Sequence, residues 1–211
     1  ILAVEEAVFA TQHQIFELRM LPLDMILNPI KKEIVSESVK LDKNIEIDIP
    51  STSFMLDKMV LEQVRTVLLH LIRNSIDHGI ESETERIALG KKPAGLISIK
   101  AVQISNRLLV TVMDDGRGIQ YDKIREKAIS FFPDKEEEIQ FMSDKDLQQY
   151  IYAAGFSTSE TATEISGRGM GMDIVRSSME KIKGKIKITS ALNEGTTFEL
   201  SIPLSMATQR G

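Results

Sequence analysis

Hydrophobic residues at the start of the chain recur at alternating spacings of three and four, which predicts a helix over residues 1–20. The seam consists of Ile1, Val4, Val8, Ile15 and Leu18. This pattern fits an amphipathic helix that packs on its own domain as well as one arm of a helical dimerisation bundle. Pro22 and Pro29 interrupt the region, and a second helix is predicted from Pro29 to about Val39.

Farther along, isoleucines at positions 45, 47 and 49 alternate with acidic residues, which predicts a half-buried strand. Apolar residues that recur along one side of a helix predict a long helix over 57–78, which ends at Gly79. The other predicted elements are strands at 97–103 and 107–113, a helical stretch at 120–152 broken near Pro133, a loop at 155–171, a helix at 172–183, and closing strands at 185–191 and 196–202. Hairpins make part of the sheet antiparallel. The order therefore predicts an α/β two-layer sandwich, with helices on one face of a mixed β-sheet.

Composition narrows the classes of function. The chain has 26 Lys and Arg against 31 Asp and Glu, a net charge of -5, which argues against nucleic-acid binding. The lack of cysteine excludes disulfides and thiolate metal sites, and it fits a reducing cytoplasm. No apolar run reaches the roughly 18 residues that span a bilayer. The chain starts without Met in what reads as the middle of a helix, so we expect a fragment of a longer protein.

Polar residues lie beside the apolar face of the predicted helix 57–78, in the run HLIRNSIDHG. His70, Asn74 and Asp77 share one helical stripe because they stand at i, i+4 and i+7. A carboxamide oxygen is a hard ligand that suits Mg²⁺, which also binds nucleotide phosphates. Taken alone, the segment fits equally well a helix whose histidines, His70 and His78, are favoured near its C-terminus by the dipole.

A second candidate lies in the run VTVMDDGRGI, where a hydrophobic strand ends at Asp114 and Gly116 and Gly118 follow. A carboxylate at a strand end can accept a hydrogen bond from an exocyclic amine such as that of adenine. The glycines let the backbone approach the base closely. On its own, the run also fits a simple Asp-Gly turn.

The third candidate is a set of alternating glycines, Gly167, Gly169 and Gly171, that lead directly into a helix. Backbone N–H groups and a helix N-terminus arranged in this way bind phosphate oxygens. The polar stretch before them suits a mobile lid, although alone it would also fit a flexible linker. A Rossmann motif is excluded because Met172 stands where its third glycine belongs, and the Walker A and protein-kinase motifs do not occur.

These three segments, followed by NEGTTFELSIP at the last strand, resemble in their order the N, G1, G2 and G3 boxes of the GHKL ATPase superfamily. The match covers about residues 41–205. The runs HLIRNSIDHGIE, DDGRGI, GFSTSE and EISGRGMGMDIVR are similar to the catalytic domain of the CheA family of chemotaxis histidine kinases. ELRMLPL at 17–23 resembles the end of the dimerisation helices of that family, and ERIALGKKPAG at 85–95 is similar to its linker after the N box.

The resemblance implies a Bergerat-type ATP-binding fold preceded by N-terminal helices. It also implies three parts: the end of a dimerisation domain at 1–40, an ATP-binding catalytic domain at 41–205, and a tail or linker at 206–211. Asn74 would coordinate Mg²⁺, with His70 near the metal or the γ-phosphate, and both would be catalytic. Asp114 would read the adenine amine, and Thr197 would lie near that carboxylate.

The resemblance extends the cofactor site to further residues. Lys123 and Lys127 stand one turn apart and either reach phosphates or form a solvated basic face. The remaining implied ATP-binding residues are Asp77, His78, Gly116, Gly118, Ile119, Ser157, Thr158, Gly167, Arg168, Gly169, Met170, Gly171 and Met172.

The implied activity is that of a protein-histidine kinase in two-component signalling, with ATP and Mg²⁺ as cofactors. The acceptor would be a histidine on a separate phosphoacceptor domain, followed by a response regulator. A homodimeric, cytoplasmic parent protein in a receptor complex is expected, without membrane insertion. In superfamily members that hydrolyse ATP, the residue at the position of His70 resembles a Glu, a general base that activates water. Because this chain has His70 there, slow ATP hydrolysis is expected. The alternatives are a regulatory ATP-binding module or slow ATPase without transfer, and a dimeric scaffold acting through residues 1–40.

Overall fold

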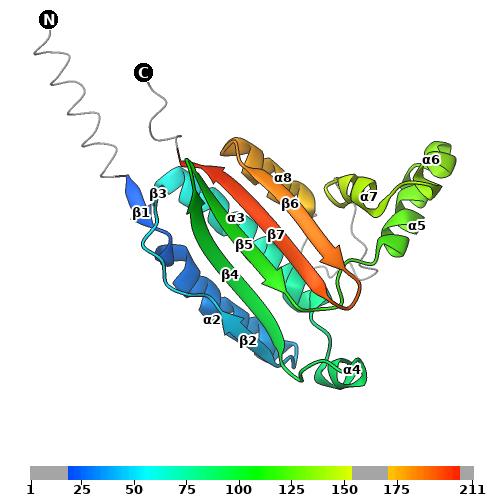
Figure 1. Cartoon of the computed structure of the whole chain (residues 1–211), viewed down its shortest axis with the longest axis horizontal. Helices are drawn as coiled ribbons and strands as arrows, with labels where there is room; N and C mark the ends of the chain where they lie inside the picture. Colours follow the sequence, from blue (N-terminus) through cyan, green and yellow to red (C-terminus); the bar gives the residue numbers. More distant parts are fainter. Residues whose placement is uncertain (1–18, 154–170, 205–211) are drawn as a thin grey trace, which may run out of the picture.

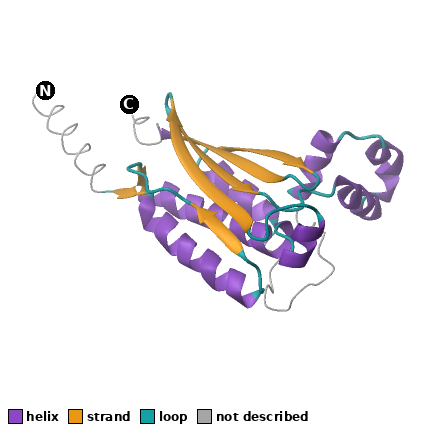
Figure 2. Cartoon of the chain, turned by 60° about the horizontal axis from the view of Figure 1, so that its bottom comes forward, coloured by secondary structure: helices purple, strands orange, loops and turns teal. Residues whose placement is uncertain are grey.

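The computed structural model describes residues 19–153 and 171–204, in which five strands form one mixed sheet. Its order is β2-β4-β5-β7-β6, with β2 parallel to β4 and the other neighbours antiparallel. The strands are β2 (Ile45–Asp48), β4 (Gly95–Ile104), β5 (Arg107–Asp114), β6 (Lys185–Ala191) and β7 (Gly195–Pro203). Helices cover one face of this sheet (Figures 1 and 2), which confirms the predicted two-layer sandwich.

The layers follow from the periodicity of the strands and helices. Every second residue of β5 is buried, namely Leu108, Val110, Val112 and Asp114. Successive side chains of a strand point to opposite faces, so all four face the helices. The covering helices are α2 (Asp24–Lys40), α3 (Lys58–Asn74) and α8 (Met172–Lys181), and their apolar residues share one core with the sheet.

The helix predicted over 57–78 has two parts. Asp57 caps the start of α3, because its side chain accepts a hydrogen bond from the backbone N–H of Met59 at 2.8 Å. After Asn74 the chain widens into a π-helix, η1 (Ser75–Gly79). The Nζ atom of Lys43 donates to the carbonyl oxygens of Ile76, Asp77 and Ile80, which have no partner in a helix that ends here.

The second predicted helix is longer than expected, because α2 begins at Asp24 and continues through Pro29. Only one backbone hydrogen bond is lost at an internal proline. The α2 residues that join the core of α3 and the sheet are Ile26, Leu27, Ile30 and Ile34. A small sheet of β1 (Met20–Pro22) and β3 (Met55–Asp57) ties the start of α2 to the start of α3. The expected boundary between residues 40 and 41 follows directly after α2, whose apolar residues share one core with α3 and the sheet.

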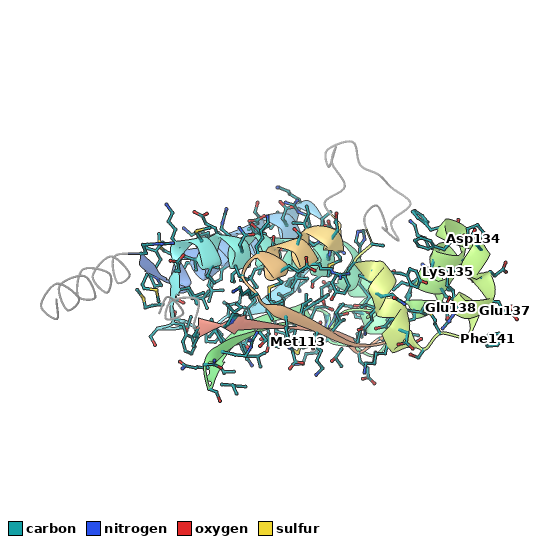
Figure 3. The ribbon with its side chains drawn as sticks, turned by 90° about the horizontal axis from the view of Figure 1, so that it is seen from above. Met113, Asp134, Lys135, Glu137, Glu138 and Phe141 are labelled. Carbon is teal, nitrogen blue, oxygen red and sulfur yellow. The ribbon has the colours of Figure 1, made fainter. Side chains whose placement is uncertain are left out.

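The stretch 120–152 forms α5 (Tyr121–Phe131), a short 3-10 turn η2 (Pro133–Lys135), α6 (Glu136–Gln140) and α7 (Asp144–Ile151), so the predicted break near Pro133 is confirmed. These helices have a small apolar cluster of their own and lie at one end of the sandwich (Figure 3). The acidic side chains labelled on α6, including Glu137 and Glu138, lie at the outer end of this group and are exposed.

Residues 1–18 of the helix predicted at 1–20 and residues 155–170 of the predicted loop lie outside the described residues. The end of that predicted helix is wrong, because Met20 begins β1. A short helix that was not predicted, α4 (Glu83–Ala88), follows η1 and starts with a capping box at Ser82 and Glu85. Within 19–153 and 171–204, none of the helices has the length and apolar character needed to cross a membrane.

Candidate functional site

The polar stripe of α3 meets the start of α8. The Nδ2 atom of Asn74 lies 3.5 Å from the Sδ atom of Met172, as donor to acceptor. His70 stands one turn earlier on the stripe and is partly buried. Burial lowers the pKa of the His70 imidazole, the charge of Arg73 lowers it further, and that of Asp173 opposes both. The imidazole is therefore mainly neutral at pH 7.

Asn74 offers a hard oxygen ligand near the start of α8. Its amide nitrogen faces Met172, so its carbonyl oxygen points away from that sulfur. In the part of the chain that the structure describes, no group of three or more His, Asp and Glu side chains could hold a metal. The donor set suits Mg²⁺, which keeps several waters and is held by one protein ligand together with phosphates.

Asp114 ends β5 on the helix side of the sheet, where its side chain is almost completely buried. Its Oδ2 atom accepts from Ser75 Oγ at 2.7 Å. Its Oδ1 atom accepts from the backbone N–H of Gly116 at 3.1 Å and from that of Thr196 at 3.3 Å. Burial raises the pKa of the Asp114 carboxyl, and these three hydrogen bonds act in the opposite direction. The result is a buried and firmly oriented acceptor.

The π-helix η1 brings the end of the N-box segment against this carboxyl group. Ser75 donates to Asp114, and a side chain added at Gly79 would lie 3.4 Å from both Asp114 oxygens. Single π-helical turns inside longer helices are frequent at functional sites. Sequence reasoning missed Ser75, which stands directly after Asn74, although it continues the buried stripe of Leu71 and Ile72 at helical spacing.

The turn after Asp114 is packed too closely for side chains. A Cβ atom at Gly116 would lie 2.3 Å from the carbonyl oxygen of Gly79, and one at Gly118 would lie 2.2 Å from that of Ala191. Gly118 also has a φ of +71°, which favours glycine. The next residue, Ile119, is partly buried, and its N–H donates to Ser190 Oγ at 2.9 Å. Because these glycines have no side chain, the turn can pack closely against Gly79 and Ala191 next to the Asp114 carboxylate.

The sheet register places Thr197 and its neighbour Thr196 on opposite faces of β7. Thr196 pairs with Asp114 across the sheet, whereas Thr197 pairs with Met113. Side chains of paired residues share a face, so Thr197 points with Met113 to the face without helices, where Figure 3 shows Met113. Thr196 is buried on the helix side, and its N–H bonds to the carboxylate. The signal missed in the sequence was the alternation of β7, because buried Phe198 and Leu200 share the face of Thr196.

The other predicted residues lie on η1, α5 and the start of α8. Asp77, His78 and Lys123 are exposed. Lys127 is partly buried, with its Nζ atom 6.0 Å from the centre of the Phe131 ring. Gly171 is the N-cap of α8, directly before Met172. The remaining candidates lie outside the described residues: Ser157, Thr158, Gly167, Arg168, Gly169 and Met170.

Comparisons with known proteins agree with this arrangement. Residues 59–206 match the family described as histidine kinase-, DNA gyrase B-, and HSP90-like ATPase. Over 196 residues the chain is 35% identical to the chemotaxis protein CheA of Halobacterium salinarum and 36% identical to that of Bacillus subtilis. Each alignment covers 93% of this chain and 29% of the relative, so the chain spans less than a third of these proteins.

Among solved structures, a similar one is the histidine kinase domain of the Erythrobacter litoralis EL346 blue-light-activated histidine kinase, with a TM-score of 0.54. It is 16% identical in sequence, and the match covers 89% of this chain and 63% of that one. At this identity the likeness shows the fold, and it agrees with the mixed sheet and single helical layer described above.

Proposed function

The chain belongs to the family of histidine kinase-, DNA gyrase B- and HSP90-like ATPases, and from this premise we propose that it is the ATP-binding catalytic core of a CheA-like protein-histidine kinase. It transfers the γ-phosphate of Mg-ATP to a histidine on a separate phosphoacceptor domain. The observation that carries the proposal is the buried carboxylate of Asp114, held at a glycine turn beside the N-box helix. An acceptor in that position suits the exocyclic amine of adenine.

Different residues contact the base and the phosphates of the nucleotide. Asp114 accepts from the adenine amine, while Gly116, Gly118 and Thr196 shape the surrounding pocket. Gly171 and the start of α8 offer backbone N–H groups to phosphate oxygens, since a helix N-terminus favours anions. The implied loop glycines Gly167 and Gly169 extend this phosphate cradle.

The chemistry at the other end of the nucleotide is positioning and charge neutralisation. Mg²⁺, when bound, neutralises charge on the phosphates, and Asn74 is the side chain that would hold it. His70 lies on the same stripe, beside the position of the terminal phosphate. The anionic phosphates of a bound nucleotide favour the protonated form of its imidazole, and an imidazolium cannot accept a proton from water as a glutamate would. Transfer to a protein acceptor is therefore favoured over hydrolysis.

Further proposals concern the protein from which this chain comes. We infer that residues 1–18 are the end of a dimerisation domain, that the catalytic unit begins near residue 20, and that residues 206–211 are a linker. The parent protein would be a cytoplasmic homodimer that works with a response regulator and a receptor complex. The similarity to chemotaxis proteins supports the proposed partners. The packing of α2 on α3 supports only the start of the catalytic unit near residue 20.

Asn74→Ala is expected to remove the dependence of ATP binding on Mg²⁺. Ligand changes of this kind lower metal affinity by about tenfold or more. Calorimetric titration of ATP into wild type and variant, each with Mg²⁺ and with EDTA, measures the effect. The matched control is Asn28→Ala, which makes the same change at an exposed position of α2. Equal Mg²⁺ dependence in wild type and Asn74→Ala would remove Asn74 from the metal site.

The kinase activity itself is tested by adding ATP labelled in its γ-phosphate together with a histidine-containing phosphoacceptor domain in trans. We expect acid-labile, base-stable label on the acceptor, while release of free phosphate in its absence stays slow. ATP binding without any transfer would favour a regulatory module instead. Rapid phosphate release without an acceptor would favour an ATPase.

A further inference from the structure

Four charged side chains lie together behind the turn that follows Asp114. Arg86 and Glu81 are almost completely buried, with 1% and 2% of their side chains exposed, and they form an ion pair of 3.0 Å. Lys91 pairs with Glu81 at 2.8 Å, and Arg86 also pairs with the Asp115 carboxylate at 2.7 Å. We call these four residues, Glu81, Arg86, Lys91 and Asp115, the charge cluster.

The two cations of the charge cluster bind the backbone of the turn itself. Lys91 Nζ donates to the carbonyl oxygens of Asp115 and Gly116, at 2.8 and 2.7 Å. Arg86 Nη1 donates to the Asp115 carbonyl at 3.3 Å. The Asp115 carboxylate completes the attachment, since its Oδ1 atom accepts from the N–H of Leu96 at 2.8 Å. Both peptide groups of the turn are thus held by their carbonyl oxygens from the side of α4.

The N–H groups of the same two peptides point to the other side of the turn, toward Asp114 and Gly79. The N–H of Gly116 donates to Asp114 Oδ1, and the N–H of Arg117 donates to the Gly79 carbonyl at 2.9 Å. A peptide group is planar, so fixing its carbonyl oxygen also fixes the direction of its N–H. The charge cluster therefore determines how the N–H groups of the turn meet Asp114 and Gly79.

Stability alone is a weak explanation for such a cluster. Its four charges sum to zero, but burying Glu81 and Arg86 and most of Lys91 costs desolvation that apolar residues of similar size would avoid. One attested use of buried ionic groups is to select a single local conformation. The contacts of Lys91 agree with that use, because two of its three partners are carbonyl oxygens of the turn.

We propose that Arg86 and Lys91 are positioning residues for nucleotide binding, which hold the Asp115–Gly116 peptides so that Asp114 is aligned to accept from the base. The proposal rests on the ATP binding proposed above and adds residues outside the four boxes. The charge cluster lies on the base side of the site, and it does not include the metal ligand. Loss of the Arg86 or Lys91 charge should therefore weaken the binding of ATP and of ADP by the same factor. The Mg²⁺ dependence of binding should stay unchanged.

The test compares Lys91→Met with wild type by calorimetric titration of ATP and of ADP, each with and without Mg²⁺. We expect the dissociation constants of both nucleotides to rise by about tenfold, with a binding stoichiometry near one. Lys91→Arg keeps the charge and the donors and should recover most of the affinity. Lys100→Met is the matched control, since it breaks an exposed ion pair with Asp48 on the open face of the sheet.

The outcomes separate positioning from a merely structural role. A structural role would lower the fraction of folded protein, seen as a reduced stoichiometry and a lower melting temperature, at an unchanged dissociation constant. That result would overturn the inference. If Lys91→Met does not fold, Asp115→Asn replaces it, because the amide keeps the bond to Leu96 while placing a donor against Arg86. If the wild type fails to bind ATP, the proposed function is refuted together with this inference. If the wild type binds ATP and the tested variant has unchanged dissociation constants, only the inference is refuted.

Discussion

Asp114→Asn is expected to lose most of the ATP affinity while remaining at least as stable as the wild type. An asparagine keeps an oxygen for the N–H groups of Gly116 and Thr196, and its amide nitrogen can donate to Ser75 Oγ. All of the contacts of the folded apoprotein are therefore preserved. The adenine amine, in contrast, loses a charged acceptor, which corresponds to an affinity about ten- to a hundredfold lower.

The stability difference should depend on pH. Burial raises the pKa of Asp114 above its value in the unfolded chain, so folding disfavours the charged form. The contribution of such a group to stability is present below the unfolded pKa and is lost as pH rises through the folded pKa. The advantage of Asp114→Asn in free energy of unfolding should consequently be largest at neutral pH and shrink as the pH is lowered.

Urea denaturation at several pH values, with ATP titration at neutral pH, measures both effects. Asp134→Asn is the matched control, since it makes the same change at an exposed carboxylate outside the site. A variant at position 114 that binds ATP like the wild type would refute the role of Asp114 in reading the base. A much less stable variant would show that the negative charge itself stabilises the fold.

Gly118→Ala is expected to destabilise the domain by about 3 kcal/mol or more, because strain and overlap add. The chain offers variants that separate the two causes. Gly90 has nearly the same backbone angle, with a φ of +74° against +71°, but nothing lies within 4 Å of the added methyl group. Gly116 has no such angle, and its methyl group would overlap the Gly79 carbonyl. Gly90→Ala should therefore cost about 1 kcal/mol.

Chemical denaturation of the three variants gives each cost as a change in free energy of unfolding. The excess of Gly118→Ala over Gly90→Ala measures the overlap with Ala191, and Gly116→Ala measures overlap without the strained angle. Nearly equal costs at positions 118 and 90 would mean that the turn yields to the added methyl group. In that case the close packing behind Asp114 would not explain these glycines.

The candidate site could be predicted where it depends on local periodicity. The stripe of His70 and Asn74 follows from the 3.6-residue period of α3, and the position of Asp114 follows from a strand that ends in a turn. The glycine runs and their order led to the superfamily, and the family comparison confirms it. Such inferences work because helix and strand periods are properties of the chain itself.

Other parts of the site depend on how distant segments meet. The choice between Thr196 and Thr197 is a matter of strand register, and shifting by one residue reverses every side chain. Ser75 lies on the buried face of the helix by its spacing, but its contact with Asp114 depends on how that helix packs on the sheet. These are tertiary outcomes, since nearby residues alone do not select among the alternatives.

The sequence by itself determined the layers, the strands that carry them, the superfamily and the residues of its boxes that fall within the described chain. The tertiary structure alone decided that α2 shares one core with α3 and the sheet and that Arg86 and Lys91 lie behind the turn at Asp115 and Gly116. The physical reason is the range of the interactions. Backbone periodicity acts over a few residues and can be read from the sequence. Burial and ion pairing stabilise contacts between distant segments, and the sequence does not indicate which of these segments meet.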